Sequence, residues 1–247
     1  MDGLKKHLRN EILRDPNVKL LATEEWTLPI QTIDVEFETV KRTKMDVLMK
    51  MLLIAFRTSG FSAIEEVSEI LVVEPLFIQD SIDRMSRAGL IVMNGDVYSL
   101  TEAGRQQLDS GTFVESPEIE EATVHYSPSH ELFLTGEPGD DEGKTYRYAA
   151  EFRHVNKIRE SEWRAALDQL DITISEGDSQ KVVHAILSVN ELERVSVPCL
   201  EFRLHQTAED RLFARVWNTM TGQWDETLEK QIMEKEIAEW RERYLKD

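Results

Sequence analysis

Histidine and cysteine are the residues of this chain with the most versatile chemistry, because they bind metals and act as bases or nucleophiles. The six histidines stand at positions 7, 125, 130, 154, 184 and 205, and no two have the H-x-x-x-H or H-E-x-x-H spacing that places metal ligands on one helix face. The single cysteine, Cys199, follows the apolar-rich run Val195-Ser-Val-Pro. We therefore expect no metal site, and we expect Cys199 to be a buried structural thiol.

Three short patterns match fragments of known motifs but lack the remainder. Glu142-Gly-Lys144 matches the E-x-K fragment of some nucleases, but it lies in a Gly-rich turn. The acidic run from Glu137 to Glu142 lacks the residue order of a calcium loop, and His154-Val-Asn-Lys157 misses the H-x-K spacing of phospholipase D-like enzymes by one residue. Glycine-rich phosphate loops and G-x-S-x-G are absent from the sequence. We therefore expect no catalytic residues, no cofactor and no enzyme; a dispersed site in the C-terminal half is a remote alternative.

The chain is strongly acidic, with 29 Lys and Arg against 47 Asp and Glu, a net charge of −18 and a pI near 4.8. Binding to duplex DNA depends on neutralising phosphates, and DNA-binding domains usually have a pI above about 9. The charge therefore disfavours a generic DNA-binding protein. A hydrophobic content of 41% is ordinary for a folded protein, so we place the excess charge on the surface.

The elements that would position functional side chains are clearest between residues 44 and 108. A nearly all-apolar stretch predicts a central helix surrounded by its domain, and it holds Val47, Leu48, Met49, Met51, Leu52, Leu53, Ile54 and Phe56. Ser62 and Glu65 form an S-x-x-E capping box, which predicts the start of a short second helix. A third helix is predicted from Pro75, which suits a first helical turn, to Gly89, which suits the left-handed residue after a helix.

A β-hairpin and a closing helix are predicted next. Asn94-Gly95 between two apolar runs is a strong hairpin signal, and Thr101 can cap the helix that follows. This order of elements resembles the winged helix-turn-helix superfamily, and the stretch from Tyr98 to Gly104 resembles the wing-to-helix junction of many bacterial winged-helix regulators. The resemblance covers residues 44–108. It implies a fold more than a function, since some winged helices bind DNA and others dock proteins.

The predicted third helix is the one that would read DNA in such a fold, and its charges are balanced. Arg84 and Arg87 follow Asp80 and Asp83 by four residues each, a spacing at which opposite charges can pair on one helix face. The hairpin from Leu90 to Leu100 has no Lys or Arg. We therefore predict weak, non-specific duplex binding at most, with Arg84 and Arg87 as candidate phosphate or base contacts.

Two further elements are predicted ahead of this region. Apolar side chains four residues apart over residues 3–15 predict a short amphipathic helix, and its Lys5 and Lys6 are further candidates for nucleic-acid contact. The stretch from Ile33 to Glu38 alternates apolar and acidic residues, which predicts a half-buried strand. This strand could pair with the hairpin or with another subunit.

After an acidic connector at residues 109–121, strand patterns outnumber helices, which predicts an α+β domain with a mostly antiparallel sheet. Strands are predicted at 122–134, with a break at Ser127-Pro128, and at 145–152, 182–189, 195–205 and 211–217; helices are predicted at 160–170 and 224–245. The last helix has a stripe that either packs on the domain's own sheet or meets a partner, and it consists of Met233, Ile237, Trp240 and Tyr244. We predict the partner role.

The predicted fold class is α+β, with a winged-helix domain and its N-terminal extension over residues 1–112 and a second domain over 120–247. We predict a non-enzymatic adaptor or regulatory subunit that docks proteins through the winged helix and the C-terminal helix, in a hetero-complex or a homodimer. The alternative is a winged-helix transcriptional regulator with a sensing or dimerisation domain. No secretory signal and no stretch of ~20 apolar residues is present, so we expect a cytoplasmic protein without membrane contact.

Overall fold

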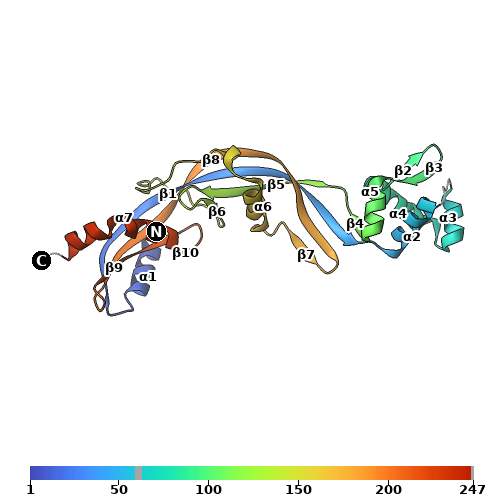
Figure 1. The fold of residues 1–247 in the computed structure, drawn as a ribbon. Helices are drawn as coiled ribbons and strands as arrows, with labels where there is room; N and C mark the ends of the chain where they lie inside the picture. Colours follow the sequence, from blue (N-terminus) through green and yellow to red (C-terminus); the bar gives the residue numbers. More distant parts are fainter. Residues whose placement is uncertain (59–62, 246–247) are drawn as a thin grey trace. The chain divides into compact units, whose positions relative to one another are not determined.

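The structure is a computed structural model that describes residues 1–58 and 63–245 (Figure 1). It is a mixed α+β fold with a mainly antiparallel sheet and a long C-terminal helix, as predicted. The chain divides into two compact units. Unit 1 consists of Met1–Val35, Ala122–Leu170 and Val189–Asp247, and unit 2 consists of Glu36–Glu121 and Asp171–Ser188.

These units are not the consecutive domains, 1–112 and 120–247, that the sequence predicts. The cause is two long strands, β1 (Val18–Lys44) and β8 (Ser179–Gln206), which each contribute residues to both units. The N-terminal helix α1 (Asp2–Ile12) and the first part of β1 therefore belong to unit 1 together with the C-terminal segment. Strands that pair across such a long separation leave no local signal of where a unit ends.

The sheet has the strand order β10-β9-β8-β1-β5-β6, with β4 also paired to β1 and β7 to β8. The remaining strands of this sheet are β4 (Thr112–Val114), β5 (Glu118–Ser127), β6 (Leu132–Leu134), β7 (Ile174–Glu176), β9 (Arg211–Asn218) and β10 (Gln223–Trp224). The alternating stretch predicted as a half-buried strand lies inside β1, where its apolar side chains are buried and Asp34 accepts a hydrogen bond from Thr123 at 2.6 Å. It pairs within this sheet, so the predicted pairing with the hairpin or another subunit was wrong.

Two of the predicted strands differ from the structure. The segments 182–189 and 195–205 form one continuous strand, β8, because the polar residues between them are exposed strand positions and not a turn. The segment 145–152 makes an isolated bridge from Thr145 to Thr27 and is otherwise irregular. Its Tyr146 is buried and stacks on Trp26, with ring centroids 4.4 Å apart, which explains the apolar pattern without a strand.

The helices of unit 1 cover its part of the sheet. They are α1, the short 3-10 helix η1 (Val155–Lys157), α6 (Glu160–Asp168) and α7 (Glu226–Tyr244). Helix α7 packs on β9, and Leu8 of α1 packs against Leu200, Phe202 and Leu204 of β8. The long C-terminal helix therefore contributes its buried side to the core of unit 1.

Unit 2 contains the predicted order of helix, helix, helix, hairpin and helix, namely α2 (Val47–Thr58), α3 (Ile64–Leu71), α4 (Pro75–Arg87), β2 (Ile91–Asn94), β3 (Val97–Leu100) and α5 (Glu102–Ser110). Pro75 is the first residue of α4, and Gly89 follows that helix with a left-handed φ of 68°. The Thr101 hydroxyl caps α5 by accepting a hydrogen bond from the Gly104 N–H at 3.0 Å. Ser62 of the predicted capping box lies outside the described residues.

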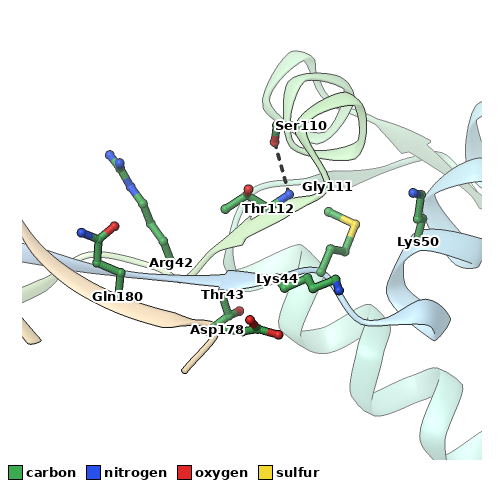
Figure 2. A pocket seen from close by; sticks show the side chains of 10 residues that line it. Arg42, Thr43, Lys44, Lys50, Ser110, Gly111, Thr112, Asp178 and Gln180 are labelled. Atoms are coloured by element: carbon green, nitrogen blue, oxygen red, sulfur yellow. Dashed lines mark hydrogen bonds between the residues drawn. The ribbon is translucent and has the colours of Figure 1, made fainter. Parts of the chain in front are cut away.

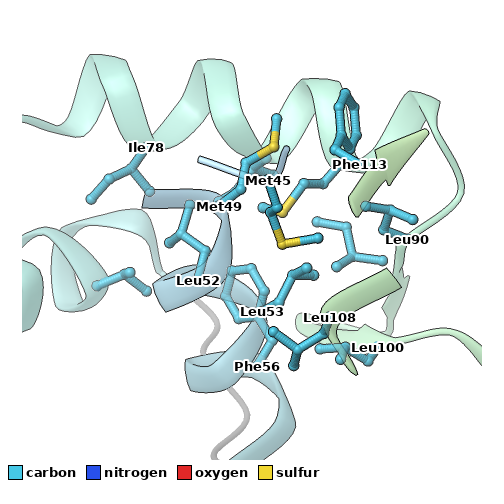
Figure 3. Close-up of a cluster of buried hydrophobic side chains, with 14 residues drawn as sticks. Met45, Met49, Leu52, Leu53, Phe56, Ile78, Leu90, Leu100, Leu108 and Phe113 are labelled. Carbon is cyan, nitrogen blue, oxygen red and sulfur yellow. The ribbon is translucent and has the colours of Figure 1, made fainter. Parts of the chain in front are cut away.

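The core of unit 2 forms around α2 (Figure 3). Leu52 and Leu53 are fully buried there. The close packing of α5 in this core requires glycine at position 104, because a Cβ there would lie 2.1 Å from the Leu90 carbonyl oxygen. The prediction that the domain surrounds α2 on all sides was wrong, since a stripe of this helix is exposed: it consists of Val47, Met51 and Ile54.

Candidate docking surface

Four strongly exposed apolar side chains lie where α3 passes into α4, and we call these residues the turn surface. Their exposed fractions are 63% for Ile70, 89% for Val72, 74% for Leu76 and 57% for Phe77. The opposite face of α4 is buried in the core of unit 2, which fixes the orientation of the helix. Single exposed apolar residues are normal, but four within eight positions are typical of a surface that contacts another molecule.

The backbone of this turn is strained at Val72, which has φ 56° and ψ 44°. This left-handed conformation favours glycine and asparagine and is an outlier for a β-branched residue. The Val72 side chain points into solvent, so packing within unit 2 does not explain why valine occupies this position. Strained residues concentrate at functional sites, and Val72 therefore makes this turn a candidate functional surface.

Acidic residues accompany the turn surface. From Ile64 to Asp83 the chain has no Lys or Arg, and its six acidic residues are all exposed: Glu65, Glu66, Glu69, Glu74, Asp80 and Asp83. A nucleic-acid backbone at this surface would meet carboxylates and no cation to neutralise its phosphates. The charge instead complements a partner that carries Lys or Arg beside apolar residues.

The two arginines of α4 do not make the ion pairs that their spacing predicts. Within the described ranges, Arg84 forms no ion pair with Asp80, and Arg87 forms none with Asp83. The Arg84 guanidinium lies over the Phe113 ring instead, 5.4 Å from its centroid. The Nε of Arg87 donates a hydrogen bond to the backbone carbonyl of Asp83 at 3.3 Å. Contact with Phe113 and with the helix backbone thus replaces the predicted pairing.

The four candidate nucleic-acid contacts are divided between the two units. The two arginines line a groove of about 310 Å³ in unit 2 whose other charged residues are Glu115 and Glu118. Lys5 and Lys6 belong to α1 in unit 1, where the Nζ of Lys5 is 2.6 Å from a carboxylate oxygen of Glu25. Each pair therefore has at least one carboxylate beside it within its own unit.

The structure corrects the predicted partner role of Trp240. Its side chain is 1% exposed, and it packs in the core of unit 1 because its stripe on α7 faces β9. Met233 and Tyr244 are partly buried against the same core. Ile237 is 40% exposed, so the partner role of this helix stays a prediction for that side chain alone.

Ser127, His130 and Asp225 form a chain of hydrogen bonds that the histidine spacing did not reveal. The Ser127 Oγ is 2.7 Å from Nδ1 of His130, and Nε2 of His130 lies 2.9 Å from both carboxylate oxygens of Asp225. An ionised carboxylate only accepts hydrogen bonds, so Nε2 carries the proton. The order of groups is that of a serine hydrolase triad, but Ser127 is fully buried and its hydroxyl does not face solvent. The array ties the turn after β5 to the start of α7.

Asp225 is also the N-cap of α7, since its carboxylate accepts a hydrogen bond from the Leu228 N–H at 3.1 Å. Burial alone would raise the pKa of Asp225, but hydrogen bonds from His130, Asn218 and Leu228 outweigh burial and hold the pKa below its ordinary 3.8. A carboxyl whose pKa is lower in the folded than in the unfolded protein stabilises the fold at neutral pH. That contribution is lost as the pH falls through the native pKa.

We predict that Asp225→Asn lowers the free energy of unfolding by about 1.5–3 kcal/mol at pH 7, the range for hydrogen bonds to a charged group. The loss should shrink as the pH falls below 3.8, because the unfolded parent then binds a proton that the folded parent binds only near its lower native pKa. Urea unfolding of both proteins from pH 7 to about pH 2, followed by tryptophan fluorescence, measures the difference. Glu226→Gln, at an exposed residue of the same helical turn, is the control. A difference that does not change with pH contradicts this account.

A buried network of charges connects α7 to the sheet of unit 1. The fully buried Glu201 carboxylate accepts hydrogen bonds from Nε1 of Trp26 at 2.8 Å and from Nε of Arg203 at 2.9 Å. It also accepts two from Arg147, at 2.7 and 3.1 Å. Glu236 of α7 accepts a hydrogen bond from Nε of Arg147, and this bond helps to hold the pKa of Glu236 below its ordinary value although burial would raise it.

One feature of the sequence could have predicted this network: the charged residues Glu201 and Arg203 lie two apart within an otherwise apolar run. Residues two apart on a strand lie on the same face of the sheet. Because an unpaired buried charge is costly, two opposite charges at such positions in a buried strand are expected to pair. Cys199 in the same run is fully buried, as expected, and burial raises the pKa of its thiol. The Glu201 carboxylate and the Cys199 thiol are therefore groups of the interior of unit 1.

Comparison of the chain with protein-family models, with curated proteins and with solved structures found no match. No helix in residues 1–58 and 63–245 is long and apolar enough to cross a membrane. Over the same residues, no group of three or more His, Cys, Asp or Glu side chains is placed to hold a metal ion.

Proposed function

We propose that residues 47–110 form a winged helix whose turn surface docks a cationic, apolar segment of another protein. The winged helix is supported by the order of α2, α3, α4, the hairpin and α5 around one core. The docking role rests on one observation, the first turn of α4. A DNA-reading helix needs polar or cationic side chains there, whereas this helix presents Leu76 and Phe77 to solvent.

The partner chemistry follows from the surface. Leu76 and Phe77 are large enough to act as anchors in a complementary apolar face. The exposed carboxylates of α3 and α4 would bind Lys or Arg beside that face and accelerate the encounter. An amphipathic helix with a basic rim combines both features. The protein would then act as an adaptor or regulatory subunit.

A synthetic amphipathic peptide of about 18 residues, long enough to be helical, tests this proposal. It carries a leucine face flanked by lysines, and its counterpart carries glutamates in place of the lysines. We expect the glutamate peptide to bind at least about 10-fold more weakly. The double variant Leu76→Ser, Phe77→Ser should weaken binding of the lysine peptide about 10-fold or more. The double variant Val92→Ser, Met93→Ser, at exposed residues of the hairpin, should bind it as the parent does.

Equal binding of the two peptides, or an equal loss in the two double variants, contradicts the docking role. A labelled DNA duplex at physiological salt tests the alternative of a DNA-binding regulator. We expect a Kd on the order of 10⁻⁴ M or weaker, the weak end of non-specific binding. Sub-micromolar, sequence-selective binding would favour the regulator.

A further inference from the structure

We infer that unit 2 carries a separate site for a phosphate ester, in the pocket where β1 passes into α2. The pocket has a volume of about 650 Å³, which is within the range of small-ligand sites. Its walls are the end of β1, the start of α2, the junction of α5 and β4, and the turn between β7 and β8 (Figure 2). It shares no lining residue with the turn surface.

Three cationic side chains line this pocket, Arg42 and Lys44 from β1 and Lys50 from α2. Arg42 and Lys44 are two residues apart on a strand and so share a face. Figure 2 shows the Arg42 and Lys50 side chains on either side of the turn at Gly111 and Thr112. All three cations are exposed, and none has an ion-pair partner in the part of the chain that the structure describes.

The remaining polar groups of the pocket complement a ligand with hydroxyl groups. Asp178 is the one acidic residue among the described lining residues, and its backbone carbonyl accepts a hydrogen bond from the Lys44 N–H at 3.3 Å. This bond holds the turn before β8 against the end of β1. The hydroxyls of Thr43 and Thr112 add neutral donors and acceptors. Three cations beside one carboxylate form a local positive excess on a chain whose net charge is −18.

This set of groups fits a phosphate ester that also carries free hydroxyls, such as a nucleotide or a sugar phosphate. The guanidinium of Arg42 can bind two phosphate oxygens at once, and the ammonium groups of Lys44 and Lys50 add point charges. The carboxylate of Asp178 can accept hydrogen bonds from sugar hydroxyls. The run Lys41-Arg42-Thr43-Lys44 was visible in the sequence, but the pocket depends on α2 and on the turn at Asp178, which only the fold brings to it.

Calorimetric titration of the full chain with ATP, ribose 5-phosphate and inorganic pyrophosphate tests this site. We expect both phosphate esters to bind with a Kd of about 1 mM or tighter. Lys44→Gln and Lys50→Gln should each weaken binding about 10-fold, because each removes a hydrogen bond to a charged group. Lys41→Gln, at an exposed neighbour on β1 that does not line the pocket, should change the Kd less than about twofold.

The role of Asp178 has its own test. Asp178→Asn should weaken binding of ribose 5-phosphate and leave pyrophosphate binding unchanged or tighter, because pyrophosphate has no sugar hydroxyl. An equal loss for both ligands overturns the assignment of Asp178. Failure of both esters to bind at 10 mM, or a loss in Lys41→Gln as large as in Lys44→Gln, overturns the site itself.

Two controls keep these outcomes interpretable. The replaced side chains are exposed, so thermal melting should match the parent within a few degrees. If a lysine variant melts at a clearly lower temperature than the parent, Arg42→Gln is measured in its place. This variant should also weaken binding of the phosphate esters about 10-fold. The double variant Leu76→Ser, Phe77→Ser should bind the phosphate esters as the parent does, which separates this site from the docking role.

Discussion

Replacing Glu201 with Gln should destabilise unit 1 by about 3–5 kcal/mol, the usual cost of removing one partner from a buried ion pair. The change keeps the size of the side chain and removes its charge, so Arg147 retains only the carboxylate of Glu236. A guanidinium cannot shed its proton to escape this cost. All five tryptophans belong to unit 1, so urea unfolding followed by tryptophan fluorescence measures the loss in that unit.

Glu193→Gln is the matched control for this prediction, because Glu193 lies on the same strand, β8, and is exposed. Its effect should stay within about 0.5 kcal/mol. If Glu201→Gln unfolds at the same urea concentration as the parent, the network does not stabilise α7 on the sheet. A loss of equal size in both variants would indicate a general effect of charge on β8.

The Leu52→Ala and Leu53→Ala proteins should each lose about 2–5 kcal/mol of stability. Both side chains are fully buried at the centre of the core of unit 2, and alanine would leave cavities that the packed neighbours fill only partly. A loss of this size is a large share of the roughly 5–15 kcal/mol that stabilises a typical domain. Thermal melting followed by circular dichroism at 222 nm records the loss of helix.

Met51→Ala is the control within the same helix, since Met51 directly precedes Leu52 and lies on the exposed stripe. We expect its melting temperature to match that of the parent within a degree or two. If both leucine variants also melt within that range, the central position of α2 is wrong.

Local signals predicted the elements of unit 2 well, because each depends on neighbouring residues. Pro75 begins α4, Gly89 takes a left-handed φ after it, and Thr101 caps α5, all as their residue types indicate. Long-range pairing was not predictable in the same way. The polar residues 190–194 resemble a turn, and only the partner strands show that β8 continues through them.

The candidate surfaces were predicted less well, since periodicity shows which residues share a face but not what that face contacts. The stripe with Trp240 had the spacing of an interaction helix, but its own sheet covers it. On α4 the spacing of Arg84 and Arg87 from Asp80 and Asp83 predicted ion pairs that the structure does not contain among its described residues. The more informative residues were Leu76 and Phe77 in the first turn of α4, whose exposure depends on how this helix packs on the core of unit 2.

The division of the chain into units has a consequence for synthesis. Unit 2 has all of its segments once Ser188 has been made, whereas unit 1 also needs Val189–Asp247. Leu8 of α1 must therefore wait for Leu200, Phe202 and Leu204 before its apolar side chain is covered. Nascent chains with uncovered apolar segments aggregate readily and depend on chaperones. Helix α1 is thus synthesised long before the residues of β8 that cover it.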